Sequence, residues 1–193
     1  GTQALAADLA DRAINSDNLK DYWDSLTNNE MMTVDQRISR LHSVIDSAKL
    51  EEDDSWLSPE IDGTFNFDSP AEIMQALENS GSSWAMETLE VLQKRSPLML
   101  HVSLRQIRLG RHMSLADELR LERTLVQHCF YTHHLKRTGA QTETVEGIRA
   151  LVIDKDHNPA WNPTRIQNVT SEMVDPFFVS PWAETDHPLA DLN

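Results

Sequence analysis

A chain of 193 residues and 22.0 kDa is long enough for one domain, or for one domain with an additional arm. Its 17 Lys and Arg residues against 31 Asp and Glu residues give a net charge of −14, which disfavours generic nucleic-acid binding because phosphates need a basic surface. The single cysteine excludes an internal disulfide and a multi-cysteine zinc site, and no apolar run approaches the roughly 18 residues that a bilayer-spanning helix needs.

Capping signals mark the first two predicted helices. Thr33 and Gln36 predict a capping box, because each side chain can satisfy the backbone amide of the other residue, and an apolar stripe follows at helical spacing. Ser69 and Pro70 predict the start of the next helix, since one can cap it and the other suits its first position. Gly81 predicts the end of that helix.

Four more helices are predicted after Gly81. One ends before Pro97, because proline disfavours helix at the preceding residue, and Pro97 can itself open the following helix, which Gly110 closes. Ser114 predicts the start of the longest helix, which reaches about His134, and the last helix covers about 144–154. Alternation of period two is rare, so no strand is predicted. The predicted fold class is mainly α, an irregular helical bundle.

Composition divides the chain into three regions. Residues 1–62 predict an N-terminal helical arm and an acidic linker, whose carboxylates cluster at 51–54. Residues 63–156 predict the main helical bundle, and residues 157–193 predict a Pro- and Trp-rich tail that wraps a surface in extended and turn conformations. Basic side chains outnumber acidic ones around residues 94–123, where an anion could be received.

Cys129 and His133 lie four residues apart in the longest predicted helix and therefore share one face. This spacing would suit a metal pair or a Cys–His nucleophile. No third ligand is evident, and a buried cysteine usually acts as a small apolar residue. Packing is therefore the favoured interpretation, and no metal site is predicted.

Glu122 occupies an apolar stripe of the same helix, between Leu119 and Val126. A buried carboxylate needs a partner or a proton. Arg149 lies on the predicted inward face of the last helix, so we expect a buried ion pair between Glu122 and Arg149 that pins the two helices together. The alternative is that Glu122 acts as a general acid or base, a role that also goes with a shifted pKa.

Two further residues stand out near the last predicted helix. Gly147 lies inside it, where glycine costs about 1 kcal/mol relative to alanine, so we expect a neighbour or ligand to approach the backbone there. Lys155 stands at its end, between Asp154 and Asp156. It is either part of a charged helix terminus or a cation aimed at an anionic ligand.

Two segments carry a family resemblance. Residues 96–122 contain Ser-Leu-Arg-Gln-Ile-Arg-Leu-Gly at 103–110, and residues 145–163 contain Gly-Ile-Arg-Ala-Leu-Val-Ile-Asp-Lys-Asp at 147–156. Together they resemble the C-terminal half of the 3-hydroxyisobutyryl-CoA hydrolase family, within the enoyl-CoA hydratase/isomerase (crotonase) superfamily. With weaker flanking likeness, the resemblance covers about residues 69–180.

The resemblance implies hydrolysis of an acyl-CoA thioester, 3-hydroxyisobutyryl-CoA in valine catabolism. In this superfamily two backbone N–H groups from glycine-containing loops stabilise the thioester oxyanion, and acidic catalytic residues belong to the same α/β half. Neither feature occurs in this sequence, so no catalytic residue is assigned, and the catalytic residues are expected upstream of Gly1. The chain is therefore expected to be the C-terminal helical part, which packs over the acyl-CoA site and exposes an apolar face.

Contacts to the phosphates of coenzyme A are expected from Lys155 and, as second choices, from Arg105 and Arg108. No cofactor is expected beyond coenzyme A as part of the substrate, and neither nucleic acid nor a membrane is expected as a partner. The expected partners are the acyl-CoA substrate, the upstream catalytic half and, as an alternative assembly, further copies of the chain in a homo-oligomer.

Two rival functions stay open. One is another enoyl-CoA hydratase or isomerase reaction, and the other is a non-catalytic helical scaffold. The ending at residues 180–189 resembles a bacterial member, which implies a cytoplasmic protein, with the mitochondrial matrix as the alternative location.

Overall fold

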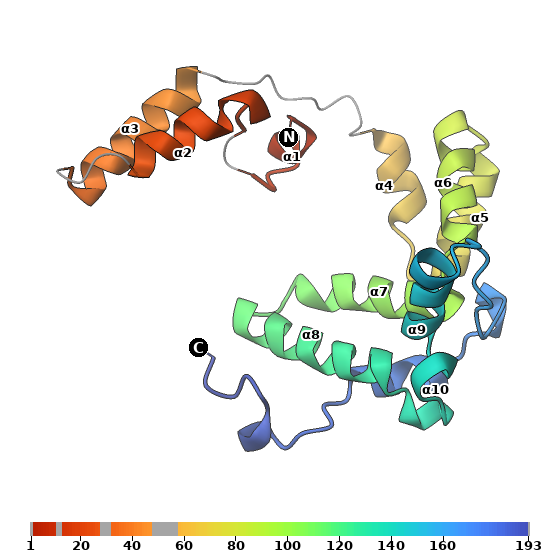
Figure 1. Cartoon of the computed structure of the whole chain (residues 1–193). Helices are drawn as coiled ribbons and strands as arrows, with labels where there is room; N and C mark the ends of the chain where they lie inside the picture. Colours follow the sequence, from red (N-terminus) through yellow and green to blue (C-terminus); the bar gives the residue numbers. More distant parts are fainter. Residues whose placement is uncertain (1, 11–12, 28–31, 48–57, 193) are drawn as a thin grey trace. The chain divides into compact units, whose positions relative to one another are not determined.

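The computed structural model describes residues 2–10, 13–27, 32–47 and 58–192 (Figure 1). The acidic cluster at 51–54 lies outside these residues. All regular structure in the described residues is helical, which confirms the mainly α prediction. The chain forms two compact units, residues 1–61 and 62–193, and each is described by itself.

The first unit is built from short helices: α1 (Thr2–Ala6), η1 (Ser16–Asn18), α2 (Leu19–Thr27) and α3 (Val34–Ser47). Helices α2 and α3 pack against each other. The backbone amide of Thr33 donates to Gln36 Oε1 at 3.0 Å, and the amide of Gln36 donates to Thr33 Oγ1 at 3.3 Å. The predicted capping box at the start of α3 is therefore confirmed.

The second unit contains the end of α4 (Pro59–Phe65) and four longer helices: α5 (Pro70–Ser80), α6 (Ser83–Gln93), α7 (Pro97–Gly110) and α8 (Leu115–Phe130). Serine side chains cap these four helices by accepting a backbone hydrogen bond: Ser69, Ser82, Ser96 and Ser114. Gly81 ends α5 at φ 64°, a left-handed conformation that glycine adopts at little cost. The predicted starts of these helices are confirmed. They could be predicted because a capping residue next to each start determines it.

Helix α8 ends at Phe130, four residues before the predicted end. Tyr131 leaves the helical conformation, and the Thr132 hydroxyl donates to the His128 carbonyl oxygen at 2.9 Å. That bond satisfies a carbonyl group that the helix end would otherwise leave free. A separate 3-10 turn, η2 (His133–Leu135), follows.

The last predicted helix has two parts. The first, α9 (Glu143–Ile148), is α-helical, and η4 (Arg149–Ile153) continues it as a π-helix, whose hydrogen bonds span one residue more than those of an α-helix. A Cβ atom on Gly147 would lie 3.3 Å from Cη2 of Trp161. The predicted close approach at this glycine is therefore confirmed, and the neighbour is an aromatic side chain of the tail.

Two apolar clusters form the core of the second unit. The first joins α7, α8 and the tail, with buried residues Leu98, Val102, Leu121, Leu125, Val174 and Phe177. The second lies between α5 and α6, with buried residues Ile73, Leu77, Ala85 and Leu89. Figure 1 shows α7 and α8 running antiparallel, with α5 and α6 as a second helical pair.

The tail is partly helical rather than only extended. It contains η5 (Ile166–Asn168), α10 (Ser171–Val174), η6 (Asp175–Phe178) and η7 (Glu184–Asp186). Phe177 is 1% exposed in the α7–α8 cluster, so the tail supplies part of the core. Residues 157–193 therefore lie in the same compact unit as residues 62–156.

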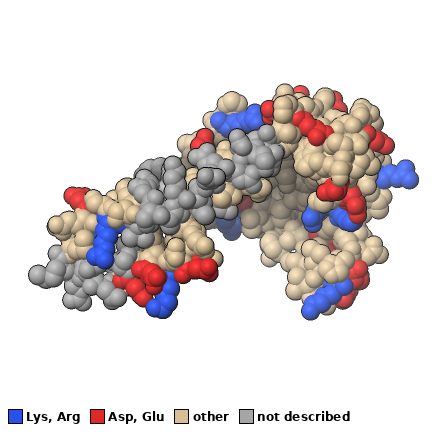
Figure 2. Space-filling view, turned by 90° about the horizontal axis from the view of Figure 1, so that it is seen from above, with Lys and Arg blue, Asp and Glu red and all other residues tan. Residues whose placement is uncertain are grey.

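The surface is charged but mixed in sign. On the face in Figure 2, Lys and Arg side chains lie close to Asp and Glu side chains. None of the helices in the described part of the chain is both long and apolar enough to cross a bilayer. Basic side chains lie close together at two places in the second unit, one on a face of α7 and one in the segment after α9.

Candidate functional site

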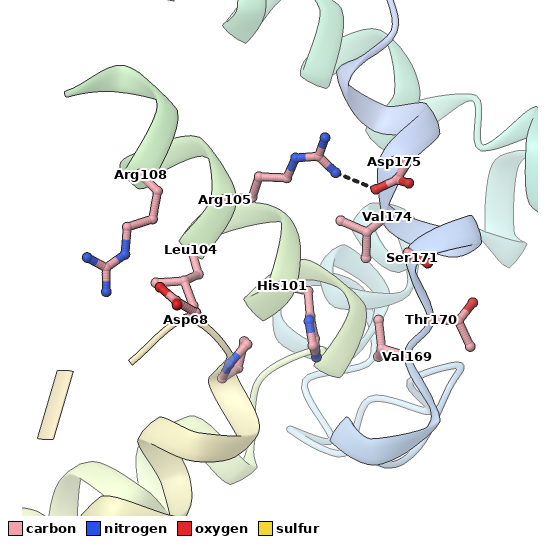
Figure 3. A pocket seen from close by; sticks show the side chains of 11 residues that line it. Asp68, His101, Leu104, Arg105, Arg108, Val169, Thr170, Ser171, Val174 and Asp175 are labelled. Carbon is pink, nitrogen blue, oxygen red and sulfur yellow. Dashed lines mark hydrogen bonds and ion pairs between the residues drawn. The ribbon is translucent and has the colours of Figure 1, made fainter. Parts of the chain in front are cut away.

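One face of α7 carries three basic residues. His101, Arg105 and Arg108 are spaced four and three residues apart, so their side chains leave the helix on the same side. They line a cavity of about 400 Å³ between α7 and the tail segment 169–175 (Figure 3). This cavity, called the α7 cavity below, brings together two of the predicted coenzyme A contacts.

Burial controls the His101 ring. It lowers the pKa of His101 below the usual 6.5, and a hydrogen bond to the backbone of Ile166 partly opposes this shift. The ring is therefore neutral near pH 7. Its Nε2 atom is buried and has no hydrogen-bond partner within the described residues.

The two arginines of the α7 cavity differ in how their charge is balanced. Arg105 Nη1 forms an ion pair with Asp175 Oδ1 at 2.5 Å, as the dashed line in Figure 3 marks. Arg108 Nη2 donates instead to the carbonyl oxygens of Phe65 and Phe67, at 3.3 and 2.9 Å. Its Nε is buried and unpartnered, and no carboxylate in the described ranges pairs with it. Arg108 is therefore the better placed of the two to bind an anion.

A second basic group stands after α9. Arg149 Nε and Nη2 donate to the two oxygens of Glu146 at 2.9 and 2.8 Å, and Nη1 donates to Asp154 and to Asp156 at 2.6 Å each. These bonds, that to Glu146 first, raise the pKa of Arg149 and lower the pKa values of Glu146 and Asp156 below their usual range. One guanidinium thus gathers three carboxylates, a group called the Arg149 cluster below.

Lys155 lies at the exposed tip of the Arg149 cluster, in a left-handed conformation with φ 55°. Its two neighbours, Asp154 and Asp156, both bind Arg149. Lys155 itself forms no ion pair within the part of the chain that the structure describes. Because its flanking carboxylates are already engaged, its ammonium group is available to an external anion.

The predicted ion pair between Glu122 and Arg149 is wrong. Glu122 lies on the exposed side of α8, whereas Leu121 and Leu125 face the core. Arg149 is bound by carboxylates of its own segment. The buried face of α8 contains Leu121 and Leu125, whereas the predicted face contained Glu122 and Val126. The two faces differ by one position along the helix, which corresponds to about 100° around its axis. The alternative role of Glu122 as a buried general acid or base has no structural support, because the side chain is not buried.

A buried carboxylate does occur, at Glu143, which is 7% exposed. Its Oε2 accepts a hydrogen bond from the Ser96 hydroxyl, and its Oε1 accepts one from the Asn162 amide at 3.0 Å. Arg137 Nη1 lies 3.6 Å from Oε1 and also donates to the Asn162 carbonyl oxygen. This Glu143 cluster joins the start of α7, the start of α9 and the tail. The sequence offers little signal for it, because an acid just after the cap residue Thr142 usually predicts an exposed first turn.

Cys129 and His133 have separate surroundings. Cys129 is partly buried against the α7–α8 core, and this burial raises the pKa of its thiol. His133 is exposed in η2, where its ring stacks on Tyr131 at 5.9 Å between centroids. The described residues contain no group of three or more His, Cys, Asp or Glu side chains suited to a metal ion. Cys129 therefore packs against the core, whereas His133 lies at the surface.

Apolar side chains are exposed at the end of α9 and on η4. Their exposed fractions run from 41% to 68%, for Ile148, Leu151, Val152 and Ile153. Ala150, between them, is fully buried and anchors the turn. Four exposed apolar side chains thus lie close in sequence around this turn, and a large exposed apolar patch is typical of a surface that another polypeptide or ligand covers. The expected apolar docking face stays a prediction.

Sequence comparison adds relatives to this picture. The 3-hydroxyisobutyryl-CoA hydrolase, mitochondrial, of Gallus gallus is 31% identical over 182 residues, which are 92% of this chain and 45% of that protein. The protein of the same name from Homo sapiens is 30% identical over 184 residues, 93% of this chain and 45% of its own length. The chain thus spans about half the length of the curated relatives it matches.

A solved structure shows the same fold. The carnitinyl-CoA dehydratase of Mycobacterium thermoresistibile is similar with a TM-score of 0.74 at 23% identity, over 98% of this chain and 49% of that one. The sequence model of the family described as enoyl-CoA hydratase/isomerase matches residues 1–178, so the likeness also reaches upstream of residue 69. Because the match covers most of this chain, the chain belongs to the enoyl-CoA hydratase/isomerase family.

Proposed function

We propose that the chain is the C-terminal helical part of an acyl-CoA thioester hydrolase of the 3-hydroxyisobutyryl-CoA hydrolase type. The observation that carries this proposal is the match of 92–93% of the chain to relatives of that name, while the chain spans 45% of their length. The catalytic centre then belongs to sequence that precedes Gly1. In this account the helical part packs over the acyl-CoA site.

The exposed apolar side chains on α9 and η4 support the proposal that a separate catalytic half packs against this helical part. Burial of apolar side chains is worth about 25 cal/mol per Å² of area removed from water, so leaving Leu151, Val152 and Ile153 in solvent forgoes stabilisation. A catalytic half that covers this surface would recover it. The upstream half is therefore the proposed partner of η4, and a homo-oligomer is the alternative occupant.

Lys155 is the proposed contact to the phosphates of coenzyme A. It is exposed, it has no ion-pair partner among described residues, and Arg149 already holds the carboxylates on either side. Arg108 is the second proposed contact, because its charge is balanced only by carbonyl oxygens. Arg105 ranks third, since an anion would have to compete with Asp175.

A second candidate function is another reaction of the same superfamily, such as hydration or isomerisation of an enoyl-CoA. The family description and the fold likeness to a dehydratase favour it. A non-catalytic scaffold is the remaining alternative. As for location, the names of the Gallus gallus and Homo sapiens relatives contain the word mitochondrial, which supports a mitochondrial location, with the matrix as the proposed compartment. The bacterial cytoplasm is the other proposal.

The test is turnover by the protein that contains this chain together with its upstream sequence. We expect hydrolysis of 3-hydroxyisobutyryl-CoA to exceed conversion of crotonyl-CoA by at least tenfold. Preference for crotonyl-CoA would establish the hydratase alternative, and no turnover of either would leave the scaffold. In the same protein, Lys155→Ala should raise the acyl-CoA KM about fivefold with kcat retained, as expected for loss of one charge-assisted contact of about 1 kcal/mol. Lys136→Ala, at another exposed lysine with left-handed backbone, is the matched control.

A further inference from the structure

The turn after η4 has a backbone that ordinary side chains adopt only at a cost. Lys155 and His157 both have left-handed conformations, with φ 55° and 53°. Neither is a glycine, so close contact between Cβ and the backbone disfavours each of them. Strained residues persist only where their surroundings hold them in place, and they cluster at functional sites. We call residues 154–158 the strained tip.

Arg149 binds the residues on both sides of Lys155. Its Nη1 donates to Asp154 Oδ2 and to Asp156 Oδ2 at 2.6 Å each, so the residues directly before and after the lysine share one guanidinium nitrogen. Its Nη2 donates to the carbonyl oxygen of Asn158 at 3.1 Å. The strained tip is therefore folded around a single side chain.

The guanidinium group of Arg149 is itself held from the other side. Glu146 accepts from its Nε and Nη2 at 2.9 and 2.8 Å, a bidentate arrangement that fixes the direction of the group. The same carboxylate accepts a hydrogen bond from the Ala160 amide at 2.6 Å. The next residue, Trp161, donates from Nε1 to the carbonyl oxygen of Lys94 at 3.0 Å, which joins this segment to the end of α6. Arg149 is therefore anchored to the second unit before it reaches the strained tip.

Backbone hydrogen bonds alone do not fix Lys155. The Asp154 amide donates to the Arg149 carbonyl oxygen at 2.8 Å, and the His157 amide donates to that of Ala150 at 3.1 Å. Neither bond includes Lys155, which lies between them. We therefore expect the direction of Lys155 to depend on the side chain of Arg149.

The bonds of Arg149 also keep two acids away from the lysine. Asp154 and Asp156 adjoin Lys155 in the sequence, and both are occupied by Arg149. Without the guanidinium group, these carboxylates would compete with an external anion for the ammonium group of Lys155. Arg149 therefore acts on Lys155 in two ways, through the backbone and through the neighbouring charges.

We propose that Arg149 is a positioning residue, which holds the strained tip so that the Lys155 ammonium group is presented to the phosphates of the acyl-CoA substrate. This inference rests on the proposed role of Lys155 and assigns Arg149 no contact of its own with the ligand. The shape of the guanidinium group matters as well as its charge. Lysine carries the same charge, but its ammonium group cannot replace a planar fork that binds three carboxylates at once.

The test measures the dissociation constant of coenzyme A by calorimetry, in the protein that contains this chain together with its upstream sequence. We expect Arg149→Lys to weaken binding at least threefold although it keeps the charge, against about fivefold for Lys155→Ala. Arg111→Met, at an exposed arginine outside the strained tip, controls for the loss of one positive charge and should change the constant less than twofold. In turnover of 3-hydroxyisobutyryl-CoA, Arg149→Lys should raise KM and retain kcat, whereas a role in packing alone would lower kcat.

A double variant separates positioning from a direct effect on the ligand. If Arg149 acts through Lys155, Arg149→Lys/Lys155→Ala should bind coenzyme A as Lys155→Ala does, because no lysine remains to be positioned. Effects that multiply, to about fifteenfold, would overturn the inference, and so would natural affinity in Arg149→Lys. Natural affinity in Lys155→Ala is a different result: it would remove Lys155 from the site, so that the proposed contact fails and this inference fails with it.

Discussion

The Glu143 cluster and the Arg149 cluster are built from the same chemical groups but occupy opposite settings. Glu143 and Arg137 are 7% and 12% exposed at the side chain, and their hydrogen bonds join segments far apart in the chain. Arg149 is on the surface, and its partners all lie between residues 146 and 158. A buried charge network therefore fixes how helices meet, whereas an exposed one shapes the local course of a single turn.

The largest expected effect is at Glu143. Glu143→Gln leaves Arg137 buried without its carboxylate, and breaking a buried pair in this way costs about 3 kcal/mol of the free energy of unfolding. Urea denaturation measures it. Glu172→Gln, at an exposed carboxylate of α10, is the matched control and should change stability far less.

The double variant Glu143→Leu/Arg137→Met sharpens this result. It removes both charges, so it should be more stable than the Glu143→Leu single variant. A double variant less stable than Glu143→Leu would show that the hydrogen bonds from Ser96 and Asn162, rather than the charge pair, carry the stability.

A smaller and local effect is expected at Arg149. Arg149→Met should lower the unfolding midpoint only slightly at pH 7, because an exposed ion-pair cluster contributes little stability. Hydrogen exchange of the Ala160 amide, which donates to Glu146 at 2.6 Å, should become faster because Arg149 no longer orients that carboxylate. If the amide remains equally protected, the cluster does not hold the turn.

The Arg149 cluster also predicts a pH dependence. Arg149 lowers the pKa values of Glu146 and Asp156 below their usual 4.5 and 3.8. The unfolded chain therefore takes up these protons first, so the stabilisation is present above about pH 4.5 and is lost as the pH falls through the lowered folded-state values. The stability advantage of the natural chain over Arg149→Met should accordingly shrink between pH 6 and pH 3.5. An advantage that stays constant over this range would contradict the assignment.

The smallest effect is expected at the α7 cavity. Burial lowers the pKa of His101 below 6.5, so the unfolded state binds its proton more readily than the folded state. Stability should therefore decline as the pH falls below about 6.5. His101→Phe should reduce this decline between pH 7.5 and 5.5, and His133→Phe, at an exposed histidine, should not. Unfolding midpoints at the two pH values provide the measurement.

Local features of the fold could be predicted from the sequence, whereas contacts between distant segments, such as the Glu143 cluster, could not. Helix starts are predictable because they are decided within four residues, as when Ser69 and Glu72 satisfy each other's amides. The Glu143 cluster depends on Ser96, which lies 47 positions away, so no local pattern announces it. The basic face of α7 follows from spacing alone, but its cavity requires the tail to fold back over the helix.

The misplacement of Glu122 has a specific cause. Helix α8 carries apolar residues on two adjacent sides, and periodicity alone does not say which side meets the core. Leu121 and Leu125 are buried, whereas Leu115 and Val126 are 77% and 51% exposed. The predicted stripe followed the exposed side. Only the packing of α7 and the tail against α8 selects the other side.

The π-helical turn η4 has a consequence for how such chains can diverge. Deleting one residue from it would restore ordinary α geometry and rotate the residues directly after it, up to the tip at Lys155, by about 100° around the helix axis. Ala150 would remain buried at the start of the turn, while Lys155 at its tip would point in a new direction. A single codon gained or lost at this position can therefore redirect a charged loop without repacking the interior.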